Sequence, residues 1–148
     1  MADLSRGVST TLGYVLNLGV AAILVTTLMI SAGTLVEDQR ERAVDTQLDV
    51  VGERVASDLE AADRLARASD GGTVRYVIEM PPRVAGSAYE VRVNPGGNDT
   101  VVLESDLPRE EVAVAVDVET TLNASVHDGG RLVAVYDAKN DTLVVDDA

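Results

Sequence analysis

An uncharged run of 30 residues, Gly7–Val36, constrains this chain more than any other feature. It follows the six-residue leader Met-Ala-Asp-Leu-Ser-Arg, and its centre, Leu12–Ile30, is apolar enough to enter a bilayer. A membrane-spanning helix needs about 20 such residues, so the run is long enough to span with some to spare. Charge returns abruptly at Glu37 and Asp38. We therefore expect an N-terminal helix that enters a membrane.

The residues alone leave two kinds of segment open. A secretory signal has an apolar stretch of about 7 to 15 residues before a small-residue cleavage site. Ser31-Ala32-Gly33 is small enough to be cut, but the stretch here is longer and a helical pattern follows it. A signal anchor stays uncut and tethers an outer domain. Because arginine prefers the cytoplasmic flank, Arg6 would then place the N-terminus inside and residues 37–148 outside.

A third interpretation comes from residues 5–16, Ser-Arg-Gly-Val-Ser-Thr-Thr-Leu-Gly-Tyr-Val-Leu. This string resembles the start of archaeal type IV pilins and pilin-like proteins, in which a short polar leader ends in a basic residue before a small residue and an apolar helix. A prepilin-type peptidase cuts those chains in front of the helix. The resemblance implies a cut between Arg6 and Gly7, with Arg6 as recognition and topology signal and Gly7 as the new N-terminus. Leu12–Ile30 would be the membrane anchor or filament core.

The string departs from the family at two places. The common archaeal motif has Ser-Pro where this chain has Ser9-Thr10, and bacterial pilins have a glutamate where this chain has Thr11. Major pilins, minor initiating subunits and secretion-associated pseudopilins share this type of front end. The departure at Ser9-Thr10 favours a minor subunit or pilin-like protein.

Several residues in the run suit contacts between helices. Gly19 is small, and small residues let helices approach closely in lipid, where packing drives association. Asn17 and Thr26-Thr27 can form hydrogen bonds across such a contact, each worth about 1 kcal/mol. Threonine and glycine are also common in spanning helices without any such role. A lone amide facing lipid is costly, so Asn17 favours a helix–helix contact.

The charge is strongly acidic and lies almost wholly outside the run. The net charge is −13, and Asp3 and Arg6 are the only charged residues before Glu37. Such a charge repels itself and is relieved by salt, which is typical of halophilic proteins. Of the 12 basic residues only Lys139 is lysine, and arginine pairs well with carboxylates. With the archaeal resemblance, we expect a halophilic archaeal protein whose outer domain loses structure at low salt.

The same composition excludes some roles. A chain with this acidity has no basic face that could neutralise phosphates, so we expect no nucleic-acid partner. Cysteine is absent, so disulfides and thiolate metal sites are excluded. His127 is the only histidine, which leaves no catalytic triad or histidine-rich zinc site, and we expect it to be a solvated residue at a strand end. We predict no cofactor, no metal and no enzymatic activity.

Downstream of the run, residues 37–68 keep a helical period. Gly52 is the one weak helix former in it. One helix from near Val8 to Ala68 would be about 90 Å long, and Asp70-Gly71-Gly72 would end it. Apolar residues recur every three or four positions, with charged residues on the opposite face: Val44, Leu48, Val51, Val55, Leu59, Ala62 and Leu65.

After the glycines the period changes to two, which predicts strands. Hairpin loops are expected at Asp128-Gly129-Gly130 and Lys139-Asn140-Asp141. The alternation suits an antiparallel sheet with one covered face, and the helical stripe is the natural cover. The predicted strands are Thr73–Met80, Ala88–Asn94, Thr100–Glu104, Val112–Glu119, Leu122–His127, Arg131–Asp137 and Thr142–Val145.

The expected fold is therefore α+β, with a long N-terminal helix packed on an antiparallel sheet, which is also the architecture that the pilin resemblance implies. We expect four regions: a prepilin-type leader at 1–6, a membrane or filament helix at 7–36, its amphipathic continuation at 37–70, and an extracellular β-rich domain at 71–148. Asn98, Asn123 and Asn140 each begin an N-glycosylation acceptor pattern.

Two functions follow as expectations. The first is a pilin-like surface subunit that is inserted in the membrane, processed by a prepilin-type peptidase and able to join copies of itself or other pilin-like subunits. Its membrane and assembly residues would include Leu12, Asn17, Gly19 and Ile30. The second is a single-span, signal-anchored protein whose outer β domain binds or supports the cell envelope. The mature N-terminus distinguishes the two functions.

Overall fold

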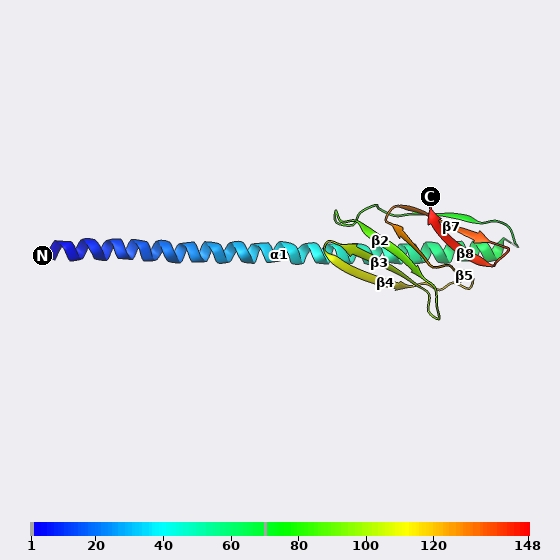
Figure 1. The fold of residues 1–148 in the computed structure, drawn as a ribbon, viewed down its shortest axis with the longest axis horizontal. Coiled ribbons are helices and arrows are strands. Elements are labelled where there is room, and N and C mark those ends of the chain that lie inside the picture. Colours follow the sequence, from blue (N-terminus) through cyan, green and yellow to red (C-terminus); the bar gives the residue numbers. More distant parts are fainter. Residues whose placement is uncertain (1, 70) are drawn as a thin grey trace. The chain divides into compact units, whose positions relative to one another are not determined.

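A computed structural model describes residues 2–69 and 71–148, with side chains described from Leu12 onward. Helix α1 runs from Ala2 to Ala68 without a break, and eight strands follow it (Figure 1). The chain forms two compact units, Met1–Gln39 and Arg40–Ala148. The uninterrupted helix and the strands after it confirm the predicted α+β class. Asp70, which was expected to help end the helix, lies outside the described residues.

The second half of α1 buries one stripe, as the sequence predicts. Six of the expected positions are buried, and they follow the three-or-four spacing of a helix face: Val44, Leu48, Val51, Val55, Leu59 and Ala62. Leu65 is 49% exposed, so its assignment to the stripe was wrong. Ala66 is buried instead, because a step of four from Ala62 keeps closer to the centre of the stripe than a step of three.

The strands form two four-stranded sheets. In the first, the order is β1 (Arg75–Glu79), β7 (Arg131–Asp137), β8 (Thr142–Asp147) and β5 (Thr121–Leu122). In the second, the order is β4 (Arg109–Ala115), β3 (Thr100–Asp106), β2 (Tyr89–Asn94) and β6 (Ser125–Asp128). Neighbouring strands are antiparallel except for the short parallel pair of β5 and β8.

Two sequence predictions about the sheet were wrong. The strand expected at Leu122–His127 is divided at Asn123-Ala124, and its halves β5 and β6 belong to different sheets. The link Asp128-Gly129-Gly130 is therefore no hairpin, since β6 pairs with β2 and β7 pairs with β1 and β8. A local period of two predicts strands but carries no information about which partner each strand finds. The hairpin at Lys139-Asn140-Asp141 joins β7 to β8 and is confirmed.

Gly129, in the link that was predicted to be a hairpin loop, packs directly against Tyr89. Gly129 donates its N–H to the Tyr89 carbonyl at 3.0 Å, and a Cβ at Gly129 would lie 2.5 Å from the Tyr89 ring. The Tyr89 hydroxyl donates to the Pro81 carbonyl at 2.6 Å, and burial raises the pKa of this phenol to about 12. Any side chain at residue 129 would collide with the Tyr89 ring, so this position requires glycine.

Strand β4 also differs from the sequence prediction. It was expected at Val112–Glu119, yet it covers Arg109–Ala115 and pairs with β3 in a hairpin that begins at Asp106 and Arg109. Past Ala115 the chain leaves the sheet, and the Val116 N–H donates to the Asp99 carbonyl at 2.9 Å. The sequence prediction missed the start of this strand because residues 109–111 are all charged and show no alternation of apolar and polar side chains.

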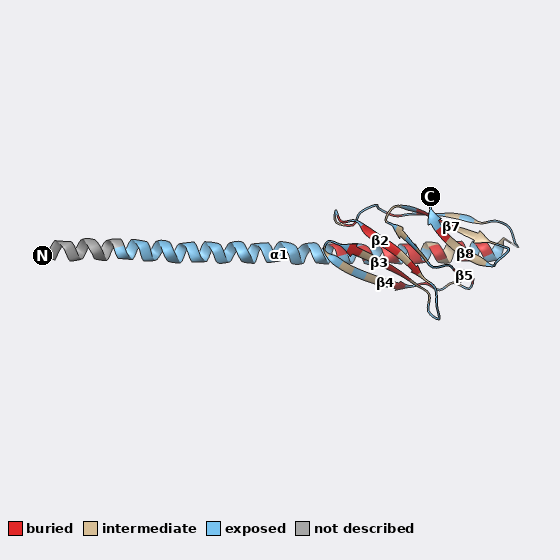
Figure 2. Cartoon of the chain, viewed as in Figure 1, coloured by how far each residue is buried: buried red, intermediate tan, exposed pale blue. Residues whose placement is uncertain are grey.

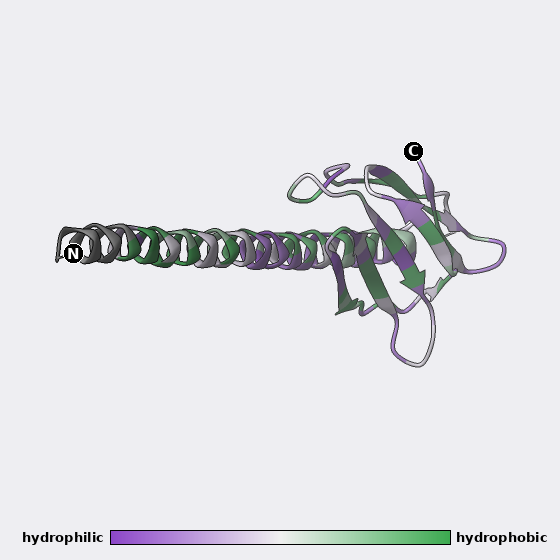
Figure 3. Ribbon diagram, turned by 60° about the vertical axis from the view of Figure 1, so that its left-hand side comes forward, coloured by the Kyte–Doolittle hydropathy of each residue, from purple (hydrophilic) through white to green (hydrophobic). Residues whose placement is uncertain are grey.

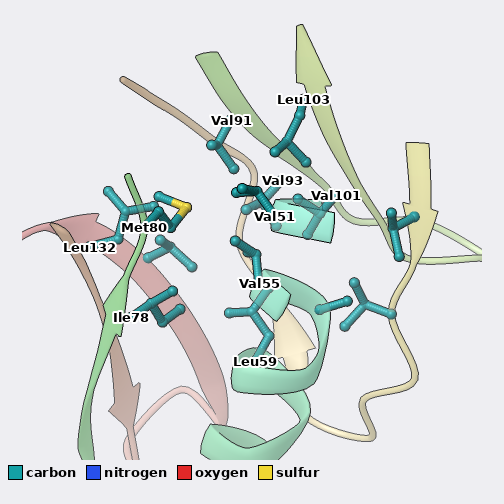
Figure 4. Close-up of a cluster of buried hydrophobic side chains, with 14 of the residues drawn as sticks. Val51, Val55, Leu59, Ile78, Met80, Val91, Val93, Val101, Leu103 and Leu132 are labelled. Carbon is teal, nitrogen blue, oxygen red and sulfur yellow. The ribbon is translucent and has the colours of Figure 1, made fainter. Parts of the chain in front are cut away.

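The helix stripe lies between the two sheets and forms the core with both. Figure 4 shows Val51, Val55 and Leu59 of α1 with Ile78, Met80 and Leu132 of the first sheet region on one side. On the other side are Val91, Val93, Val101 and Leu103 of the second sheet. The buried residues of this unit concentrate along this seam (Figure 2). The expected cover of a sheet by the helix is confirmed, with two sheets in place of one.

At Gly52 the helix packs tightly against side chains of the second sheet. A Cβ built there would lie 2.8 Å from Val114 Cγ2 and 3.1 Å from Leu103 Cδ1. Both distances are shorter than ordinary van der Waals contact, so even alanine would require the helix or the Val114 and Leu103 side chains to shift. The weakest helix former of the stripe is therefore the residue that permits the packing.

The C-terminal end of α1 is fastened to the loop after β4 by a buried carboxylate. Asp63 is 1% exposed and accepts hydrogen bonds from the Thr120 N–H at 3.0 Å and the Glu119 N–H at 3.4 Å. Arg67 Nε donates to it at 3.0 Å, and Arg67 also pairs with Glu119 at 2.9 Å. Burial raises the pKa of Asp63, but these hydrogen bonds and the Arg67 charge outweigh it and the pKa lies below its ordinary value.

Candidate membrane and assembly site

The first unit presents a helix whose described side chains are all exposed, from Leu12 to Val36 (Figure 2). We call Leu12–Val36 the apolar segment. Fourteen large apolar residues contribute to its surface: Leu12, Tyr14, Val15, Leu16, Leu18, Val20, Ile23, Leu24, Val25, Leu28, Met29, Ile30, Leu35 and Val36. Figure 3 shows hydrophobic colour along this part of α1 and hydrophilic colour where the charges return.

This surface is large enough to require a cover. Helix α1 is the one helix among the described residues that is long and apolar enough to cross a membrane, with a mean hydropathy of 2.1 over its best window, none of which is buried. Fully burying one large apolar side chain is worth about 1.5–3 kcal/mol. For 14 such residues the total is on the order of 20–40 kcal/mol, which exceeds the roughly 5–15 kcal/mol that stabilises a whole domain.

The hydroxyl groups of the apolar segment are satisfied within the helix. Thr26 Oγ1 donates to the Ala22 carbonyl at 2.8 Å, and Thr27 Oγ1 donates to the Ile23 carbonyl at 2.9 Å. Ser31 and Thr34 make the same kind of bond. These bonds use the single proton of each hydroxyl, but the oxygens keep free lone pairs that can accept, so a role of Thr26 and Thr27 in a helix contact stays a prediction.

Unlike these hydroxyl groups, Asn17, Gly13 and Gly19 face open space on the helix surface. The Asn17 side chain is exposed, and no hydrogen bond from it appears within the residues that the structure describes. A Cβ added at Gly13 or Gly19 would meet nothing within 4 Å. In lipid an unpaired amide is costly and a small residue admits a neighbouring helix closely, so this surface suits a polar contact with another helix. Leu12 and Ile30, at the two ends of the apolar core, are both 65% exposed.

The expected prepilin-type cut falls between Arg6 and Gly7, near the start of α1. Helix α1 includes Arg6 and Gly7, but their side chains lie outside the described residues.

The three candidate glycosylation residues all lie on the surface of the second unit. Asn98 is exposed in the β2–β3 connection, Asn123 between β5 and β6, and Asn140 in the β7–β8 hairpin. Asn140 Nδ2 donates to Asp137 Oδ2 at 2.7 Å. The hydrogen bonds from the Lys139 N–H and from the Asn140 side chain hold the pKa of Asp137 below its ordinary value. All three asparagines are placed where a glycan could extend into solvent, and their modification stays a prediction.

His127 is not the solvated residue that the sequence predicts. Its side chain is 8% exposed, with Nδ1 3.1 Å from Asp147 Oδ1 and Nε2 3.1 Å from the Val145 carbonyl. Since a carbonyl oxygen only accepts, Nε2 donates to it. His127 lies on β6 and its partners lie on β8, so it links the two sheets. No group of three or more histidine or acidic side chains suited to a metal occurs in the described part of the chain.

A row of carboxylates crosses the outer side of the second sheet. Glu104 lies directly opposite Glu111 and Glu90, and Glu90 lies opposite Asp128. Like charges at directly opposed positions destabilise a sheet. Arg92 offsets the row at one point, 3.7 Å from Glu104. We call Glu111, Glu104, Glu90 and Asp128 the acidic row. The sequence shows the acids, but only strand register places them side by side.

The fold and this surface define a class of protein: an α+β chain with one N-terminal helix that could be a single membrane span. More specifically, the chain belongs to a family of unknown function, DUF7266, whose family model matches residues 3–146. Comparison with curated proteins gave no match, and neither did comparison with solved structures.

Proposed function

We propose that this protein is a type IV pilin-like surface subunit, held in the membrane by its apolar segment and trimmed between Arg6 and Gly7. The observation that carries the proposal is the division of helix α1. Its residues 44–66 supply buried side chains to the core of the second unit, whereas the side chains of Leu12–Val36 are exposed throughout. A subunit that moves between lipid and an assembly of helices needs such a surface.

In the proposed role the N-terminus lies in the cytoplasm and the β domain lies outside the cell. Asn17, Gly13 and Gly19 support assembly, since they leave a polar group and open space on the exposed surface of this part of the helix. The partners would be the membrane, a prepilin-type peptidase, and copies of the same chain or other pilin-like subunits. The role is structural and non-catalytic, in a halophilic archaeal setting.

The mature N-terminus tests this proposal. We expect the intact mass and N-terminal peptide of protein from cells with a prepilin-type peptidase to start at Gly7, and the same chain to keep its leader in cells without the enzyme. Arg6→Gln should abolish the cut, while Arg40→Gln, which removes the same charge on the far side of the apolar segment, should leave it unchanged.

The alternative outcomes are distinct. A leader that is intact, or merely trimmed of Met1, in the presence of the peptidase would favour a signal-anchored envelope protein. A start just after Ser31-Ala32-Gly33 would favour a secretory signal. Either result would overturn the pilin-like proposal.

A further inference from the structure

A pocket with two arginines lies at the start of the second unit. It has a volume of about 330 Å³ and is lined by Arg40 of α1, by Arg83 and residues 86–88 of the β1–β2 connection, and by Asp106 and Leu107 at the end of β3. We call it the arginine pocket. Its size falls within the range of small-ligand sites, about 300–1,000 Å³.

Hydrogen bonds fix the three parts of this pocket to one another. Val84 and Ser87 exchange backbone hydrogen bonds of 2.9 and 2.8 Å, which closes a tight turn in the β1–β2 connection. The Ala85 N–H at this turn donates to Gln47 Oε1 of α1 at 2.6 Å. On the other side the Ser87 hydroxyl donates to the Leu107 carbonyl. The helix, the turn and the β3–β4 hairpin therefore hold the pocket in one shape.

Ala85, in this turn, adopts a backbone conformation that a residue with a side chain disfavours, whereas Gly86 adopts it freely. Ala85 has φ of 44° and Gly86 has φ of 82°. A left-handed φ is rare for a residue with a side chain and costs about 1–3 kcal/mol, so it persists only where surrounding contacts enforce it. Here the Val84–Ser87 pair and Gln47 enforce it, and the turn carries Arg83 into the pocket wall.

Both arginines are available to an anion. In a chain with 25 acidic residues, none of the ion pairs within the described residues includes Arg40 or Arg83. Arg83 Nη1 donates to the Gly86 carbonyl at 3.3 Å, which orients its guanidinium. Asp106 also lines the pocket and belongs to none of these ion pairs of the described residues, so the lining keeps one net positive charge. Guanidinium groups bind phosphate oxygens in pairs.

The sequence places this pocket close to the membrane. Arg40 is four residues after Val36, the last residue of the apolar segment. A chain extends by at most about 3.6 Å per residue, so their Cα atoms are within about 14 Å. Leu107, on the same pocket, is 76% exposed at the end of its hairpin. An exposed leucine beside two arginines combines an apolar group with phosphate-binding groups, as the boundary between headgroups and acyl chains requires.

We propose that the arginine pocket binds the phosphate headgroup of an anionic lipid in the membrane that holds the apolar segment. Arg40 and Arg83 hold the phosphate, and Leu107 contacts the upper part of the acyl chains. Because the pocket is on the second unit, lipid binding anchors the β domain to the bilayer surface. This inference rests on the proposed membrane insertion.

The absence of cysteine makes a clean experiment possible. The full chain carrying Leu107→Cys is labelled with an environment-sensitive fluorophore and placed in nanodiscs with increasing phosphatidylglycerol in phosphatidylcholine. We expect a blue shift that rises with the anionic fraction. Arg40→Gln or Arg83→Gln should each raise the fraction needed for half of the shift by about fivefold. The matched control is Arg75→Gln, which removes an exposed arginine of β1 outside the pocket.

The outcomes separate this inference from the proposed function. A shift that is equal in both lipids, or equally sensitive to Arg75→Gln, would overturn the arginine pocket as a lipid site. Inorganic phosphate that reproduces the shift in neutral detergent would assign the pocket to free anions and overturn the lipid. In each of these cases retention of the chain in the nanodisc leaves membrane insertion standing, whereas a chain that is not retained contradicts insertion itself.

Discussion

The two halves of helix α1 differ in where their apolar side chains go. Between residues 44 and 66 the helix buries a stripe between two sheets, and its exposed side is mostly charged or polar, with Val50 and Leu65 as apolar exceptions. In the apolar segment, leucine and isoleucine occur on every side and are exposed. A stripe of limited width needs one partner and finds it within the chain, whereas an apolar surface on all sides needs lipid or other helices.

The largest expected effect contrasts a leucine from each half. Leu59 is fully buried, so Leu59→Ala should leave a cavity and lower the free energy of unfolding of the second unit by about 2–5 kcal/mol. Leu24→Ala removes the same atoms from a side chain that is 59% exposed and should leave this unfolding unchanged. Near-ultraviolet circular dichroism of the full chain in detergent, during denaturant titration, measures both. An equal loss in the two variants would contradict the division of the helix.

The Asp63 contacts should give the next largest effect. Asp63→Asn removes the charge that three donors share and should destabilise the second unit by about 1–3 kcal/mol at neutral pH. The pKa of Asp63 is lowered by folding, so its contribution is complete above the ordinary value of about 3.8 and declines as pH falls through the lower folded value. The unfolding free energies of the two proteins should therefore converge below about pH 3.8.

Asp58→Asn is a useful comparison for that pH series, since Asp58 sits one turn earlier and is more exposed. A gap between Asp63→Asn and the parent chain that stays constant from pH 7 to the acid range would contradict the electrostatic contribution of Asp63.

Gly52→Ala should have a smaller effect, because two terms oppose each other. Alanine favours a helix over glycine by about 1 kcal/mol, but a Cβ 2.8 Å from Val114 Cγ2 costs about 1–3 kcal/mol. Val114 is β-branched and cannot turn away freely. We expect a net loss of about 1 kcal/mol in thermal or denaturant unfolding, with Gly33→Ala, which meets no atom within 4 Å, showing none. A stabilised Gly52→Ala protein would show that helix and sheet do not approach so closely.

The smallest expected effect concerns salt. Glu90 lies between Glu104 and Asp128 in the acidic row, so Glu90→Gln should raise stability at low salt by a few tenths of a kcal/mol to about 1 kcal/mol. Screening should remove this gain in molar salt. Glu53→Gln, on an exposed helix position, removes the same charge and should do less. Equal gains from both variants would assign the salt dependence to net charge alone.

Local patterns in the sequence predicted much of this fold. The apolar segment, the buried stripe and strand β7 follow from periodicity, because neighbouring residues determine which face of an element is apolar. Pairing between distant strands does not follow from it. The switch between sheets at Asn123-Ala124 and the acidic row both depend on which strands meet.

Only part of the candidate functional sites could be predicted from the sequence. The surface of Leu12–Ile30 was expected, whereas the burial of His127 and the arginine pocket were not, since their residues are far apart in the sequence. In the sequence itself, only Arg40, a positive charge shortly after the apolar segment, pointed to that pocket.

The most direct measurement compares two single cysteines on the two halves of α1. Ile23 is 68% exposed and Val50 is 64% exposed, so within one isolated chain Ile23→Cys and Val50→Cys would react at the same rate with a membrane-impermeant maleimide. In intact cells or native membranes we expect Val50→Cys to be labelled and Ile23→Cys to be protected, because lipid or neighbouring helices cover the apolar segment. Labelling of Ile23→Cys at the rate of Val50→Cys would contradict that cover, and with it the proposed function.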